Sequence, residues 1–146
     1  MNYGKMEQML RALIRADLSA FREFGRQLQN ERWPDAPAFG TATFYVAVNR
    51  RFAHNQPVDD IIHYVAELRT TLPADDDLNP RAAEHLIRLA VRDEDVSLDE
   101  FPASQQVHAQ QMVIFDIMSQ ENLSDEELDE FFAEVRQMLG ESTPAK

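Results

Sequence analysis

The chain contains no cysteine, and its only glycines are Gly4, Gly25, Gly40 and Gly140. Without cysteine there is neither a disulfide framework nor a thiolate metal site. The glycines stand far apart in the chain, so they cannot form the glycine-rich loop that holds the phosphates of a nucleotide. These absences exclude a nucleotide or dinucleotide enzyme.

Catalytic and targeting motifs are missing as well. There is no Gly-x-Ser-x-Gly and no His-Glu-x-x-His, so neither a serine nucleophile nor a zinc-protease site has candidate residues. No segment approaches the roughly 20 consecutive apolar residues that a membrane span needs. Charged residues interrupt positions 1–15, so we expect no signal peptide there. The sequence therefore predicts a cytoplasmic protein with no cofactor and no attachment to membranes.

The chain is acidic, with a net charge of −12, but its two parts differ in sign. Residues 1–56 carry eight Lys and Arg against five Asp and Glu, a net charge of +3. Residues 57–146 carry six against twenty-one, a net charge of −15. Because an acidic body repels phosphate backbones, the composition argues against nucleic acid as a partner.

Length and composition predict one globular domain. The chain has 146 residues, of which 44% are hydrophobic, enough to bury a core of ordinary size. We expect the domain to span residues 1–140. Gly140 ends the last helical pattern, and residues 141–146 should fray as a short tail.

Residues 6–28 show the clearest helical pattern in the chain. Their apolar side chains fall on one face of a helix with 3.6 residues per turn: Met6, Leu10, Leu13, Ile14, Leu18, Phe21, Phe24 and Leu28. A second line beside that face consists of Arg11, Arg15, Arg22 and Arg26. We expect one long amphipathic helix. Its arginines face the acidic half of the protein, water or an anionic partner.

Two prolines interrupt this pattern at residues 30–37, which indicates a connector between helices. The connector contains Trp33, and Phe39 follows it. Two interpretations of these large side chains remain open: a lid folded down on the core, or an anchor for a partner protein.

Residues 41–53 fit two kinds of secondary structure. Phe44, Val48 and Phe52 share one face of a helix, but the segment also reads as a short buried strand. A lone strand cannot satisfy its own backbone groups, and the chain offers no second strand to pair with it. We therefore expect a helix.

Further helices are predicted at residues 57–72, from residue 80 onward, at 105–120 and at 125–139. Proline in the first turn or acidic residues near the start mark their beginnings, and Ser124 with Glu127 has the spacing of a capping box. The helix at 105–120 is apolar on most sides, so we expect it at the centre. The predicted fold is all-α, a compact bundle of about six helices.

Two short segments resemble each other at an offset of 67 residues: 64–69 reads YVAELR and 131–136 reads FFAEVR. Each lies in a helix that begins with acidic residues and follows an apolar helix. Either two similar helical hairpins face each other, or the likeness is chance, since amphipathic helices draw on few residue types.

Metal sites have weak support in the sequence. The closest grouping is His54, Asp59, Asp60 and His63, which could hold a metal with one more ligand but also looks like an ordinary solvated helix face. Residues 93–104 lack the Gly and the Glu of a calcium-binding EF-hand loop, and the aspartates at 75–77 lack a later carboxylate. The helical pattern places Asp116 at an exposed edge.

These observations favour a non-enzymatic protein–protein interaction or regulatory module, because catalytic groupings are missing while charge is segregated on the surface. The partner is another protein or a second copy that pairs through the N-terminal helix. Two alternatives stay open: a helical metal-binding protein or metalloenzyme using the His54–His63 group, and an acidic mimic of nucleic acid. The candidate partner-binding residues are Arg11, Arg15, Arg22, Arg26 and Trp33, or instead the acidic surface of Asp125, Glu126, Asp129 and Glu130.

Overall fold

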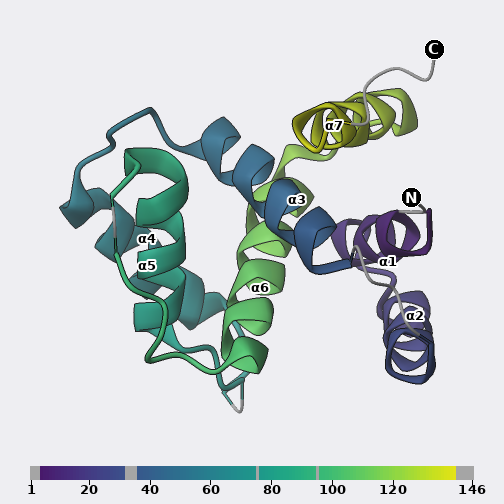
Figure 1. The fold of residues 1–146 in the computed structure, drawn as a ribbon, viewed down its shortest axis with the longest axis horizontal. Helices are drawn as coiled ribbons and strands as arrows, with labels where there is room; N and C mark the ends of the chain where they lie inside the picture. The colour runs from purple at the N-terminus through teal and green to yellow at the C-terminus, as the bar shows by residue number, and fades with distance from the viewer. Residues whose placement is uncertain (1–3, 32–35, 75, 95, 141–146) are drawn as a thin grey trace.

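A computed structural model describes residues 4–31, 36–74, 76–94 and 96–140, and Figure 1 shows their arrangement. The described residues form seven helices and no strand, which confirms the predicted all-α class with one helix more than the expected six or so. None of these helices has the combined length and hydrophobicity that crossing a membrane requires. In chain order they are α1 (Gly4–Ile14), α2 (Leu18–Asn30), α3 (Ala36–Arg51), α4 (Val58–Thr71), α5 (Pro80–Arg92), α6 (Ala103–Glu121) and α7 (Asp125–Met138).

Helices α3 and α6 form the centre of the bundle. Helix α3 packs against α1, α5, α6 and α7, and α6 packs against α1, α3 and α5 (Figure 1). The segment for which a strand was the alternative is thus a helix, and it begins at Ala36 because Pro37 fits the first turn. Its buried Thr43 donates its hydroxyl to the carbonyl oxygen of Phe39 at 2.8 Å, so no polar group is left unpaired there.

Three phenylalanines join α3 to α7. Phe39 and Phe132 stack with ring centroids 6.1 Å apart, and Phe131 meets Phe132 edge-to-face at 5.0 Å. All three rings are at most 1% exposed. Phe39 is therefore a core residue on α3, in keeping with a side chain that folds onto the core and not with an exposed partner anchor.

The helices do not pair as two similar hairpins. Helix α4 packs against α5, whereas α3 packs against α6 and α7 and makes little contact with α4. The likeness between residues 64–69 and 131–136 therefore does not correspond to two equivalent helix pairs. Both segments supply apolar side chains to the core, among them Tyr64, Val65, Phe131 and Phe132.

The N-terminal pattern forms two helices, so the prediction of one long helix is wrong. Ala16 has a left-handed backbone with φ of 62°. The N–H groups of Ala16 and Asp17 donate to the carbonyl oxygens of Leu13 and Ala12, which is the Schellman arrangement that ends a helix. The Asp17 side chain then accepts a hydrogen bond from the N–H of Ala20 and caps α2.

Helices α1 and α2 run antiparallel as a hairpin. An ion pair of 2.7 Å between Lys5 Nζ and Glu31 Oε1 joins the start of α1 to the residue that follows α2. Met6, Leu10 and Leu13 of α1 belong to the core, whereas α2 lies outside α1 at the edge of the molecule (Figure 1).

Replacing Ala16 by Gly should stabilise the protein by about 1 kcal/mol, because an alanine in the left-handed region costs about 1–2 kcal/mol that glycine avoids. The same replacement at Ala20, inside α2, should destabilise by about 1 kcal/mol. Urea unfolding followed by circular dichroism measures both changes. If Ala16→Gly lost as much stability as Ala20→Gly, the result would contradict the break at Ala16 and would support one continuous helix.

Candidate functional site

The predicted arginine line is divided between the two N-terminal helices, and its α1 members bind the chain's own acidic residues. Arg11 forms ion pairs with Glu7 at 2.8 Å and with Asp129 at 2.7 Å. Arg15 forms an ion pair of 2.9 Å with Asp125 and donates a hydrogen bond of 2.6 Å to the carbonyl oxygen of Leu123. These two arginines therefore fix α1 to the start of α7.

Glu7 is the centre of this contact. Its carboxylate accepts hydrogen bonds from Arg11 and from Arg136, and its side chain is only 15% exposed. Burial disfavours the charged guanidinium of Arg11, but the hydrogen bonds to Asp129 and Glu7 outweigh it and raise the pKa of Arg11 above its ordinary value. Arg11 also lies 5.1 Å from the centre of the Phe132 ring.

The alternative acidic surface on α7 takes part in the same contact. Asp125 and Asp129 are the carboxylates that hold Arg15 and Arg11. Glu126 and Glu130 lie on the exposed part of α7. The two surfaces predicted as separate partner sites are therefore, in part, the two sides of one internal interface.

The α2 members of the line are exposed. Arg26 pairs with Glu23 one turn earlier on the same helix. Arg22 makes neither a hydrogen bond nor an ion pair with any residue that the structure describes. Trp33, the fifth predicted partner residue, lies outside the described residues.

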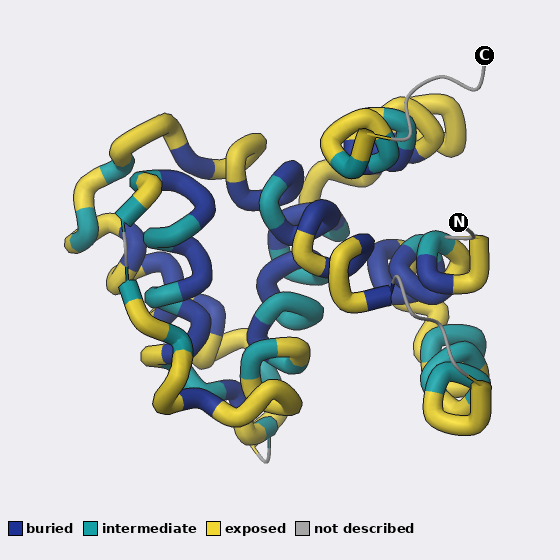
Figure 2. The backbone as a smooth tube through the Cα atoms, viewed as in Figure 1, coloured by how far each residue is buried: buried dark blue, intermediate teal, exposed yellow. Residues whose placement is uncertain are grey.

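Helix α2 is strongly amphipathic, but it contributes no buried residue (Figure 2). Phe21, Phe24 and Leu28 are half-buried against the core, and Leu18 is 45% exposed. In the described part of the chain α2 packs chiefly against α1. The apolar side of α2 is thus only partly covered: Leu18 and the accessible part of Phe21 form an open apolar edge beside its contact with α1.

A shallow apolar groove of about 210 Å³ continues this open surface. Met6, Leu28, Pro37 and Val107 line it, together with the backbone of Gly40. Val107 on α6 is 47% exposed, so this side of the groove is open to solvent.

Asp116 is not at an exposed edge, as the helical pattern predicted, but in a half-buried contact between α4 and α6. The Tyr64 hydroxyl donates a hydrogen bond of 2.7 Å to Asp116 Oδ2, and Gln120 donates one of 3.0 Å to Oδ1. Tyr64 and Asp116 line a polar cavity of about 270 Å³ with Arg50, Arg51 and Glu67. Sequence reasoning missed this pair because the partners are 52 residues apart and share no local spacing.

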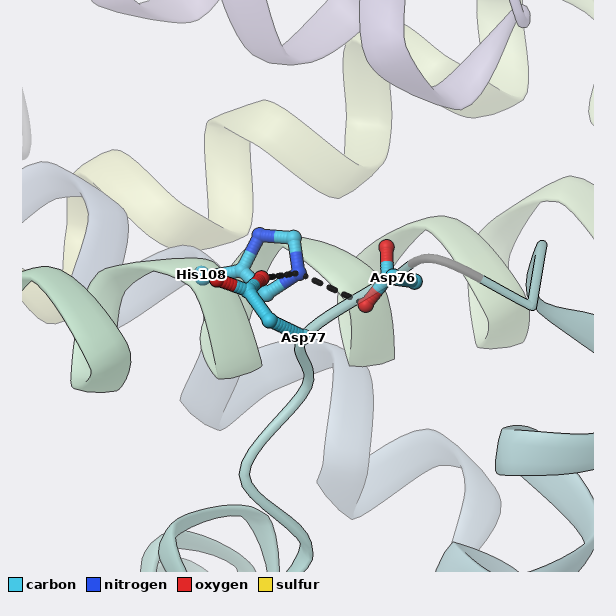
Figure 3. Close-up of side chains that lie close together, drawn as sticks. All are labelled: Asp76, Asp77 and His108. Atoms are coloured by element: carbon cyan, nitrogen blue, oxygen red, sulfur yellow. Dashed lines mark hydrogen bonds and ion pairs between the residues drawn. The ribbon is translucent and has the colours of Figure 1, made fainter.

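The metal-ligand group suggested by the sequence does not assemble. His54, Asp59, Asp60 and His63 are not among the side chains whose donor atoms converge in the described part of the chain. The side chains that do converge are Asp76, Asp77 and His108, with donor atoms within 4.8 Å of one another (Figure 3). The sequence offers no later carboxylate to complete a site with the aspartates at 75–77. The fold instead brings His108 of α6 beside Asp76 and Asp77.

No protein-family model, curated protein or solved structure matches this chain. Function must therefore be inferred from the contacts of its own residues.

We expect Arg11→Ala to lower the free energy of unfolding by about 1–2 kcal/mol, because it leaves the carboxylate of Glu7 with one partner fewer in a partly buried site. Arg26→Ala, which removes an exposed pair on α2, should change it by no more than about 0.5 kcal/mol. Chemical denaturation of the two variants beside the wild type tests this difference. Equal effects at both positions would contradict the division of the arginine line.

The Tyr64–Asp116 contact predicts loss of stability in alkali. Burial of the phenol, and then its hydrogen bond to Asp116, raise the pKa of Tyr64 far above its ordinary value. The folded protein therefore keeps a proton that the unfolded chain releases above about pH 10, so stability should fall by about 1.4 kcal/mol per pH unit from there upward.

Unfolding in urea at pH 8 to 11 measures this loss. Tyr64→Phe should remove the corresponding part of the slope, whereas Tyr45→Phe, at a half-buried position, serves as the matched control. An unchanged slope in Tyr64→Phe would show that the phenol is not held in its neutral form.

Proposed function

We propose that this protein is a non-enzymatic protein-interaction module whose contact surface is α2 and whose partner is a second copy of the chain. The observation that supports the proposal is the open apolar edge of α2. A helix with a clear apolar face ordinarily buries that face. Here the helix buries no residue completely within the described part of the chain.

The residues of the open edge have a helical spacing suited to another helix. At 100° per residue, Leu18, Phe21, Arg22 and Gly25 lie within roughly 100° of the α2 circumference. Two of these residues are apolar, one is an arginine that pairs with no described residue and one is a glycine, and the polar Gln29 lies in the same arc. A helix laid along this edge would cover Leu18 and the outer part of Phe21.

Gly25 has no explanation inside a single copy. A glycine in the middle of a helix costs about 1 kcal/mol relative to alanine. A Cβ atom added at Gly25 would meet no described residue within 4 Å, so packing against the described part of the chain does not require a glycine there. Close approach of another chain does account for it, because the missing side chain leaves a depression on the edge.

The edge is complementary to itself. If two α2 helices cross antiparallel with the two-fold axis between positions 21 and 22, Leu18 of each copy lies over Gly25 of the other. Arg22 of each copy then lies over the Phe21 ring of the other, where a guanidinium is attracted to the ring face. Both contacts occur twice, as a two-fold interface requires.

The groove beside α2 extends this surface. Its apolar lining, with exposed Val107, adjoins Leu28 at the far end of the helix. A contact based on one 13-residue helix is nevertheless small compared with a stable dimer interface, which buries about 1,200–2,000 Å². We therefore expect reversible association, with a dissociation constant of about 1–100 µM.

Sedimentation equilibrium at about 0.15 M salt, where long-range repulsion between the acidic bodies is screened, should show a monomer–dimer equilibrium. Gly25→Leu should weaken association at least tenfold, because it fills the depression that receives Leu18. The same substitution should raise the stability of the monomer by about 1 kcal/mol, since leucine favours the helix.

Ser19→Leu is the matched control. It adds the same side chain to an exposed position of α2 outside the proposed edge, and it should leave association unchanged. A wild type that remains monomeric at 1 mM would overturn self-association through α2, and so would a Gly25→Leu variant that associates as the wild type does.

A further inference from the structure

The connector between α4 and α5 and one face of α6 bring two carboxylates to the same imidazole nitrogen. His108 Nε2 lies 2.9 Å from Asp76 Oδ1 and 3.6 Å from Asp77 Oδ1. Figure 3 shows both carboxylates directed at this nitrogen, while the other ring nitrogen points away from them. The aspartates and the histidine are separated by about thirty residues of chain, so the tertiary fold assembles the group.

Among the residues that the structure describes, no lysine or arginine forms an ion pair with Asp76 or Asp77, although Arg69 lines the same surface cavity as Asp76. All other ion pairs between described side chains have a lysine or an arginine as their cation. Here two carboxylates share one imidazole, which carries at most one positive charge. Neighbouring carboxylates repel each other, and a divalent cation between them removes that repulsion.

The group is held in place by backbone and side-chain contacts. Asp76 Oδ1 also accepts a hydrogen bond of 2.8 Å from the N–H of Leu78, which orients the carboxylate. Close by, Asn79 donates a hydrogen bond of 2.7 Å to Gln105, one turn before His108 on α6. The connector is thus tied to α6 beside the cluster, and two of the three candidate ligands are preorganised.

The exposure of the three side chains leaves the group open on one side. The side chain of Asp76 is 15% exposed and that of His108 is 31% exposed, whereas Asp77 is 94% exposed. A bound ion could therefore keep water in its remaining coordination positions, and it could enter from the side of Asp77.

We propose that Asp76, Asp77 and His108 bind a divalent transition-metal ion, with Zn²⁺ as the best match. Zinc binds histidine nitrogen and carboxylate oxygen at about 2.0–2.2 Å, so the ligand atoms of a tetrahedral site lie about 3.3 Å apart. The two separations in the structure, 2.9 Å and 3.6 Å, lie on either side of this value. Two carboxylates and one imidazole also offer too few oxygen ligands for Ca²⁺, which takes about 6–8.

On binding, the ion takes the place of the proton between His108 Nε2 and Asp76. The imidazole must then be neutral, with its remaining proton on Nδ1, the nitrogen that points away from the carboxylates. Asp76 and Asp77 each contribute one carboxylate oxygen. The side chain of Asp77 is exposed, so Asp77 is the ligand whose removal should disturb the fold least.

Isothermal titration of tag-free protein, treated with chelator and then titrated with ZnCl₂, tests the site. We expect one equivalent of Zn²⁺ with micromolar affinity. His108→Gln and Asp76→Asn should each weaken binding at least tenfold, since even the loss of an outer contact to a metal ligand costs about 10–100-fold. Asp77→Asn should weaken binding several-fold with no change in the melting temperature of the metal-free protein, because its side chain is exposed.

His63→Gln is the matched control, because His63 is an exposed histidine near acidic residues on α4. It should bind Zn²⁺ as the wild type does. Saturating Zn²⁺ should also raise the melting temperature of the wild type and of His63→Gln by several degrees, but not that of His108→Gln. Co²⁺ in place of Zn²⁺ should give a visible absorption band that His108→Gln abolishes.

Two results would overturn the proposal. One is the absence of saturable binding below 1 mM Zn²⁺ in the wild type. The other is Zn²⁺ affinity that His108→Gln and Asp77→Asn leave unchanged, which would assign the ion to different residues and leave the His108–Asp76 contact as a tie between the connector and α6.

Discussion

The packing of α3 against α6 and α7 is the contact on which the rest of this structure depends. Phe39 of α3 is enclosed by α7, and Val48 on the same helix is fully buried. Because α3 is apolar on most sides, it can be covered only if several helices surround it. This requirement places α1 beside α7, and that placement in turn decides where the charged residues of both helices meet.

The contact between α1 and α7 shows how the bundle uses its uneven charge. The basic first part of the chain and the acidic remainder are not two outward surfaces, because Arg11 and Arg15 meet Asp129 and Asp125 at their junction. The exposed ion pairs of this contact contribute little free energy. The partly buried carboxylate of Glu7 contributes more, because it binds both Arg11 on α1 and Arg136 on α7. Charge segregation in the sequence therefore reflects internal pairing as well as surface character.

Two features remain that internal packing does not explain. The edge of α2 carries Leu18, the half-buried Phe21 and a glycine that the described chain does not fully cover, and Asp76 and Asp77 meet His108 without an ion pair to a described lysine or arginine. They lie in different parts of the fold and involve different forces, one the burial of apolar surface and the other the neutralisation of charge. The two features therefore support separate proposals.

Residue patterns alone were enough to predict the helical class, the central position of residues 105–120 and the helix starts at residue 80 and at Ser124, since periodicity and capping depend on neighbours within one or two turns. The turn at Ala16 that separates α1 from α2 also depends on local backbone conformation. Alanine rarely adopts a left-handed backbone, so the residue type gives no sign of this turn. The packing of the helices, by contrast, brings Arg15 to Asp125, Tyr64 to Asp116 and His108 to Asp76. The members of each pair are 32 to 110 residues apart, and side chains so distant are brought together by how the helices pack, which no local spacing records.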